Sequence, residues 1–190
     1  EDVNVDPEDV SVDPALLAED RKYSGPFVGF AAIEPDFLSI NYIDKFDRVE
    51  DFNLGNVLSA RAAFAAESLG SLENTLLMEV SDSDGSRITP TSFVRGEVGA
   101  NGRANSEGLD DVIGHAELKY YNVLGAKFFR EVYLGKHTLA TSMRLDYGED
   151  LDRDRQFLLG AGNGLRGYED RAFDGSQRLI INLEDRVHFV

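Results

Sequence analysis

The 190-residue sequence contains no cysteine and no tryptophan. Without cysteine the protein can form neither a disulfide framework nor a thiolate metal site, and it has no thiol nucleophile. It also lacks any apolar run that approaches the ~18 residues of a membrane helix. These absences exclude a disulfide-rich scaffold and a helical membrane protein. They leave open a membrane protein built of strands, in which apolar and polar residues alternate.

Positive charge is scarce as well. The 19 lysine and arginine residues stand against 35 aspartate and glutamate residues, which gives a formal net charge of −16 at pH 7. A chain this acidic repels phosphate groups, so we do not expect nucleic acid as a partner. The excess of acidic residues has two possible explanations. They lie in solvated loops of a salt-adapted protein, or they form a surface that binds calcium. The spacing of the N-terminal acids matches no EF-hand loop, and this favours solvated loops.

Residues 1–25 differ in composition from the rest of the chain. They are rich in acids and contain two Val-Asp-Pro triplets, and Asp-Pro steps favour turns and extended chain over helix. We therefore predict an acidic linker at 1–25 and one β-domain at 26–190. A strand-like run continues to the last residue, Val190, so we expect this domain to stop before its final strands.

From residue 26 onward, strand-like runs alternate with turn signals. The runs cover residues 27–33, 37–43, 57–67, 75–80, 92–100, 112–121, 136–147, 156–159 and 178–190. The dipeptide Asp84-Gly85, which lies between two of these runs, is a strong turn signal. No long helix is expected, so the predicted fold class is all-β.

Two of the runs show which kind of β protein to expect. In 112–121, Leu118 and Tyr120 fall on one face and Glu117 and Lys119 on the other, and 136–147 alternates in the same way. Alternation over about ten residues exceeds the ~5–6 residues of an average strand and matches the ~9–11 that cross a bilayer. Charges in the middle of a strand suit a water-filled lumen. The pattern favours an antiparallel transmembrane β-barrel, in contact with lipid, over a soluble β-sandwich.

The most specific pattern lies between residues 155 and 190. A glycine-rich segment at 160–164 leads into Arg166-Gly167-Tyr168, and a final strand follows. That strand carries polar side chains at alternate positions, namely Asn182, Glu184 and Arg186. Alternation places these three on one face and Leu179, Ile181 and Leu183 on the other. Asp185 falls on the apolar face, where a charge is costly, so we expect it near a rim of the barrel.

This constellation resembles the BamA/TamA-like outer-membrane assembly and two-partner-secretion family, also called the bacterial surface antigen family. In that family an Arg-Gly-Phe/Tyr tripeptide lies on a long extracellular loop that folds back into a sixteen-stranded barrel. The resemblance implies a loop lock in which Arg166, with Gly167 and Tyr168, meets the carboxylate of Glu184. It also implies that Asn182 and Arg186 face the lumen beside Glu184.

We expect the Arg166–Glu184 pair to be partly buried and bidentate, and we expect Gly167 to allow a sharp backbone turn. The family barrel has sixteen strands, and the strand-like runs of this sequence correspond to about eight or nine of them. The resemblance places the protein in the outer membrane of a Gram-negative bacterium, where it would assemble or translocate proteins. Its partners would be outer-membrane lipid and unfolded outer-membrane or secreted client proteins.

Catalysis is not expected from this sequence. The histidines, His115, His137 and His188, lie on separate runs without metal-ligand spacing, and neither a nucleophile elbow nor a phosphate-binding loop is present. We therefore predict no enzyme activity, no metal and no cofactor. Two other interpretations stay open, which are a soluble, acidic β-sandwich that acts as a binding module and a passive porin-like channel.

Overall fold

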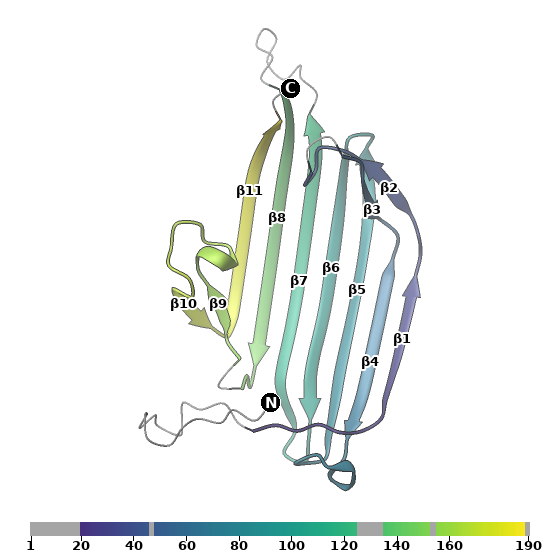
Figure 1. The fold of residues 1–190 in the computed structure, drawn as a ribbon, viewed down its shortest axis with the longest axis vertical. Coiled ribbons are helices and arrows are strands. Elements are labelled where there is room, and N and C mark those ends of the chain that lie inside the picture. The colour runs from purple at the N-terminus through teal and green to yellow at the C-terminus, as the bar shows by residue number, and fades with distance from the viewer. Residues whose placement is uncertain (1–19, 46–47, 125–134, 153–154, 189–190) are drawn as a thin grey trace.

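The computed structural model describes residues 20–45, 48–124, 135–152 and 155–188 (Figure 1). Its main element is a seven-stranded antiparallel sheet with the order β1-β4-β5-β6-β7-β8-β11. The strands are β1 (Phe27–Ile33), β4 (Val57–Ala65), β5 (Thr75–Thr89), β6 (Ser92–Ala104), β7 (Leu109–Leu124), β8 (Lys136–Glu149) and β11 (Gln177–His188). The predicted all-β class and the antiparallel pairing are confirmed.

Two small antiparallel pairs lie outside this sheet. One joins β2 (Phe37–Ile40) to β3 (Glu50–Asn53), and the other joins β9 (Phe157–Leu159) to β10 (Phe173–Gly175). Short 3-10 helices occur at Glu67–Leu69 and Ala161–Asn163. The expectation of eight or nine strands in one sheet therefore fails for the described residues, because the runs at 37–43 and 156–159 pair locally. No helix among these residues is long and apolar enough to cross a membrane.

The turn predicted at Asp84-Gly85 is wrong. Strand β5 continues through both residues, with Asp84 opposite Gly96 and Gly85 opposite Arg95, and the chain reverses after Thr89. Glycine is explained at this position by the close approach of the Leu54 backbone. The Gly85 N–H donates to the carbonyl oxygen of Leu54 at 3.0 Å. A Cβ at this position would lie 2.9 Å from the Leu54 Cδ2 atom. Glycine in a strand can mark such an approach as well as a turn.

The main sheet has one apolar face, and the strand register makes it continuous across all seven strands. This apolar face carries Val28, Phe30, Leu58, Ala60, Ala62, Phe64, Leu76, Met78, Val80, Val98, Ala100, Ala116, Leu118, Met143, Leu145, Leu179, Ile181 and Leu183. Acids also lie on it, namely Asp82 and Asp84 of β5 and Asp185 of β11. Among its exposed large side chains, Leu76 is 37% accessible and Leu183 is 72% accessible. The described chain therefore leaves this face largely uncovered.

The opposite, polar face carries charged side chains along the strands and is partly covered by two segments. One is the strap, defined as residues 34–45 and 48–56, which connects β1 to β4 and includes β2 and β3. The other is the Arg-Gly-Tyr loop, defined as residues 155–176, which connects β8 to β11 and includes β9 and β10. The hydrophobic core lies under the strap, where Leu38, Ile43 and Leu54 pack against Phe93 of β6.

Candidate functional site

The candidate site predicted from the sequence lies on the polar face of β11, where Arg166 approaches Glu184. The Arg166 Nη2 atom is 3.1 Å from Glu184 Oε1, and the other carboxylate oxygen, Oε2, accepts a hydrogen bond from Arg186 Nε at 3.0 Å. The Arg166 side chain is 87% exposed. The structure thus brings the two residues together, but the contact is not the partly buried, bidentate pair that we expected. Since Arg186 occupies the second oxygen, Arg166 makes a single, solvated contact.

Arg186 extends this contact to the strap. Its Nη1 atom lies 2.7 Å from Asp44 Oδ1 and donates to the carbonyl oxygen of Ile43 at 2.8 Å. Arg166, Glu184, Arg186 and Asp44 therefore form a line of alternating charges from the Arg-Gly-Tyr loop to the strap. The sequence predicted the loop end of this line, but it did not indicate that Asp44 would be at the other end.

Asn182 occupies the neighbouring position on the same face, where its amide Nδ2 donates to Ser142 Oγ at 3.4 Å. It helps to line a hollow of about 210 Å³ between the loop and the sheet. Gly164 borders this hollow in a left-handed conformation, with φ of 112°, and a Cβ there would meet Ile180 Cδ1 at 3.0 Å. Glycine is therefore favoured at 164 both by its backbone conformation and by its nearness to β11.

The rest of the motif shapes the loop without touching Glu184. Gly167 has φ of 94°, which is the left-handed turn expected from the sequence. The Tyr168 ring packs on Phe173 with centroids 5.8 Å apart, and both side chains are about half exposed. Gly167 and Tyr168 therefore set the path of the loop, and only Arg166 of the tripeptide contacts the β11 carboxylate.

The base of the Arg-Gly-Tyr loop is held more firmly than its tip. Arg178 at the start of β11 lies 2.7 Å from Asp146 Oδ2 and also donates to the carbonyl oxygen of Leu158 at 2.9 Å. Asp146 is 1% exposed, and its Oδ1 atom is 3.1 Å from Arg144 Nε. The Arg178–Asp146 pair was not predicted from the sequence, although both residues fall on the polar faces of their strands.

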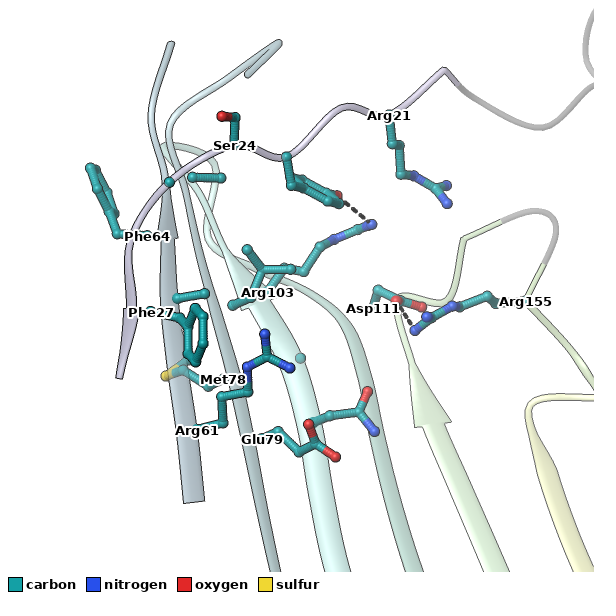
Figure 2. A pocket seen from close by; sticks show the side chains of 17 residues that line it. Arg21, Ser24, Phe27, Arg61, Phe64, Met78, Glu79, Arg103, Asp111 and Arg155 are labelled. Carbon is teal, nitrogen blue, oxygen red and sulfur yellow. Dashed lines mark hydrogen bonds and ion pairs between the residues drawn. The ribbon is translucent and has the colours of Figure 1, made fainter. Parts of the chain in front are cut away.

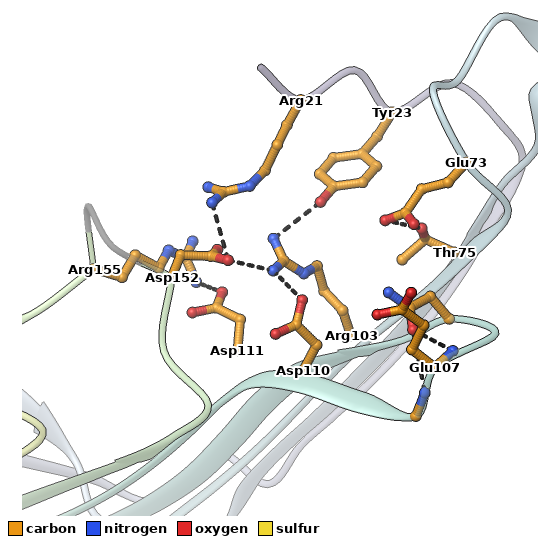
Figure 3. Close-up of polar contacts among 12 residues, drawn as sticks. Arg21, Tyr23, Glu73, Thr75, Arg103, Glu107, Asp110, Asp111, Asp152 and Arg155 are labelled. Atoms are coloured by element: carbon orange, nitrogen blue, oxygen red, sulfur yellow. Dashed lines mark hydrogen bonds and ion pairs between the residues drawn. The ribbon is translucent and has the colours of Figure 1, made fainter. Parts of the chain in front are cut away.

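A second cluster of charges lies at the end of the sheet near residue 20, with Arg103 at its centre (Figure 3). The Arg103 Nη2 atom is 2.5 Å from Asp110 Oδ2 and 2.6 Å from Asp152 Oδ1, and Nη1 donates to the Tyr23 hydroxyl at 3.0 Å. Arg21 lies 2.9 Å from the same Asp152 oxygen. Arg21 and Tyr23, at the end of the predicted linker, are therefore held across the end of the sheet. Residues 1–19 lie outside the described part of the chain.

A cavity of about 600 Å³ lies beside this cluster on the polar side of the sheet (Figure 2). Its charged lining consists of Arg21, Arg61, Glu79, Arg103, Asp111 and Arg155. Arg155 is paired with Asp111 at 2.5 Å, and the Arg61 guanidinium lies 4.6 Å from the centroid of the Phe27 ring. Nearly all of the positive charge in this cavity is therefore already paired with a neighbour.

Asp185, one of the acids on the apolar face, has a local partner. Its Oδ2 atom lies 2.8 Å from Nδ1 of His137, the second residue of β8, at the end of the sheet where the strap lies. This position agrees with the expected placement near a rim. His115 lies 3.5 Å from Glu97, and His188 packs on Tyr42 with centroids 5.4 Å apart. Within the described ranges no group of histidine and acidic side chains could hold a metal ion.

Together the fold and these contacts define an all-β chain with a large antiparallel sheet, one bare apolar face and one charged face covered by two segments. Comparisons with protein-family models, with curated proteins and with solved structures give no match to this chain.

Proposed function

We propose that this chain forms part of the wall of a bacterial outer-membrane β-barrel that assembles or translocates proteins. The apolar face contacts lipid, and the polar face lines the lumen. The observation that carries the proposal is the uncovered apolar face across all seven strands of the main sheet. Soluble monomers rarely expose a contiguous apolar patch larger than a few hundred Å².

The lengths and faces of the strands support this orientation. The strands β5 to β8 contain between 13 and 16 residues each, which is longer than the ~9–11 residues needed to cross a bilayer. The side chains opposite the apolar face include Arg61, Glu117 and Arg144, which are charged and lie within their strands. A water-filled lumen solvates such charges, whereas the packed interior of a sandwich would have to neutralise them.

The assembly or translocation role is supported by the loop constellation. Arg166 lies on a long loop that folds over the polar face and contacts Glu184, as the resemblance to the surface antigen family implies. We propose that this contact is a loop lock that positions the loop near β11. Unfolded outer-membrane or secreted proteins would then be the clients.

The first experiment tests the membrane part of the proposal. The full chain, unfolded in urea, is diluted into lipid vesicles, into detergent and into plain buffer, and folding is followed by heat-modifiable gel mobility. We expect folding with lipid or detergent only. A chain that folds and stays monomeric in plain buffer would show that the soluble β-sandwich is the correct interpretation.

A matched pair of variants on adjacent residues of β11 sharpens this test. Ile181 is 65% exposed on the apolar face, and its neighbour Asn182 points to the polar face. An arginine on the lipid face costs about 2–4 kcal/mol near the bilayer centre. We therefore expect Ile181→Arg to lower the yield of folded protein in vesicles, whereas Asn182→Arg leaves that yield nearly unchanged.

A further inference from the structure

The strap crosses the polar face at one end of the main sheet and reaches strands far from its own in sequence. Near its C-terminal end, Leu54 accepts a hydrogen bond from Gly85 of β5 at 3.0 Å. Two residues earlier, Phe52 packs on Phe93 of β6 and on Tyr121 of β7, with centroids 4.9 and 6.2 Å apart. The strap therefore lies over the central strands as well as beside β1 and β4, which it connects (Figure 1).

The tip of the strap reaches the far edge of the sheet. The carbonyl oxygen of Tyr42 accepts a hydrogen bond from Thr138 Oγ1 of β8 at 2.5 Å, and Lys136 Nζ lies 3.9 Å from the centroid of the Tyr42 ring. Arg186 of β11 donates a hydrogen bond to the carbonyl oxygen of Ile43 and forms an ion pair with the carboxylate of Asp44. The strap thus spans the polar face from β1 to β11.

The sheet itself is adapted to this cover. Phe93, Tyr121 and Val123 lie on the polar face, which elsewhere carries charges, and together they form an apolar patch under the strap. Phe93 and Ile43 are both fully buried at this contact. Apolar side chains in these positions would be exposed to water if the strap left, so burial opposes its release. The strap is fixed on the sheet by packing, and its charged tip adds to that packing.

We propose that the strap is a fixed plug that closes the lumen to ions at this end of the barrel. The proposal rests on the proposed function, since a lumen exists only if the sheet forms part of a barrel. It goes further in one respect, because it predicts that ions do not pass through the lumen while the strap is in place. A passive porin-like channel requires an open, water-filled lumen along its whole length.

The main test replaces the strap without disturbing the strands that it connects. The Glu34 N–H donates to the carbonyl oxygen of Asn56 at 2.8 Å, so the two ends of the strap are already paired. Residues 35–55 can therefore be replaced by Asn-Gly, a dipeptide suited to a two-residue hairpin turn. The full chain and this variant are inserted into vesicles that contain a potassium-sensitive dye, and ion flux is measured.

We expect slow ion flux for the full chain and flux several-fold faster for the replacement variant. If the full chain already conducts as fast as the variant, the plug proposal is wrong while the barrel stands. If the full chain folds in buffer and does not insert at all, the proposed function fails and the plug fails with it.

A second set of variants covers the case in which the replaced chain does not fold. The double variant Ile43→Ala with Leu54→Ala removes strap side chains that pack in the core with Phe93. Val49→Ala serves as the control, since Val49 is an exposed apolar residue of the same strap. We expect faster ion flux for the double variant only, and equal flux for the full chain and both variants would overturn the plug.

The absence of cysteine provides a readout that does not depend on conductance. A cysteine introduced by Val123→Cys is the only thiol in the chain and lies against the core under the strap. We expect a charged maleimide to label it slowly in the otherwise unaltered chain and several-fold faster after the strap is replaced. Equal labelling rates would show that the strap does not shield this face, which would overturn the plug.

Discussion

The two segments that cover the polar face are held in different ways. The strap places Ile43 and Leu54 in a buried core with Phe93, and polar contacts of its tip are added to this packing. The Arg-Gly-Tyr loop reaches β11 through Arg166, whose side chain is 87% exposed, and is fastened by charged groups at its base. The segment with the recognisable motif is therefore the less firmly held of the two.

This difference indicates different roles for the two segments. A segment anchored by apolar burial cannot leave without exposing that surface to water, so it suits a permanent closure. A solvated ion pair contributes little free energy, so a segment held by one can adjust its position. Variants that weaken each anchor in turn test this comparison.

The largest effect is expected at the centre of the strap core. Phe93→Ala removes a fully buried ring, and the expected loss of unfolding free energy is about 3–5 kcal/mol. Urea unfolding of the protein in vesicles measures it. Phe173→Ala in the loop is the matched control, since that ring is 51% exposed and should cost much less. Equal losses would contradict the distinction between the two segments.

The second-largest loss of unfolding free energy is expected at the base of the Arg-Gly-Tyr loop. Arg178→Leu leaves the buried Asp146 carboxylate with Arg144 alone, and we expect a loss of about 3 kcal/mol in unfolding free energy, the lower end for breaking a buried pair. The same unfolding experiment measures it. Arg95→Leu is the control, because Arg95 is exposed and has no ion pair within the described residues. A loss as small as that of the control would mean that the base does not anchor the loop.

A smaller effect is expected at the tip of the strap. Asp44→Ala removes an ion pair with Arg186 in which the Asp44 side chain is 52% exposed, so the loss of unfolding free energy should stay below about 1 kcal/mol. The buried core should hold the strap in place. A loss as large as that of Phe93→Ala would show that the charged tip, and not the packing, fixes the strap.

The smallest effect on stability is expected at the motif itself. Arg166→Ala removes one solvated contact, and we expect a change of about 0–0.5 kcal/mol in unfolding free energy. The readout that should change is the accessibility of the loop, measured by limited proteolysis of the folded protein between residues 160 and 175. If the rate of cleavage does not change, the loop lock is wrong, whatever the effect on stability.

Alternation along single strands predicted much of the fold. It placed Leu118 and Glu117 on opposite faces, and it assigned Asn182 and Glu184 to one face, as the register shows. Local turn chemistry was less reliable, because Gly85 serves a close approach to Leu54 and not a turn. A glycine in such a sequence is compatible with a turn and with a close approach of another segment. Only the position of the strap shows which of the two occurs.

The strap and the Arg103 cluster could not be predicted from local patterns. Asp44 and Arg186 are 142 residues apart in sequence, and Arg103 and Tyr23 are 80 apart. No period-two or turn signal encodes such distant contacts, which depend on how the strands are ordered in the sheet. One signal was present, since aromatic residues such as Phe93 and Tyr121 interrupt the polar face at the strap.

The orientation of the apolar face toward lipid is the central claim, and a scan along β11 tests it most directly. Single cysteines introduced at residues 179–184 of the cysteine-free chain carry nitroxide labels, and their accessibility to oxygen and to a water-soluble nickel complex is measured in vesicles. We expect a period of two, with residues 179, 181 and 183 accessible to oxygen in lipid and residues 180, 182 and 184 not. Labels at 179, 181 and 183 that the nickel complex reaches freely would contradict the claim.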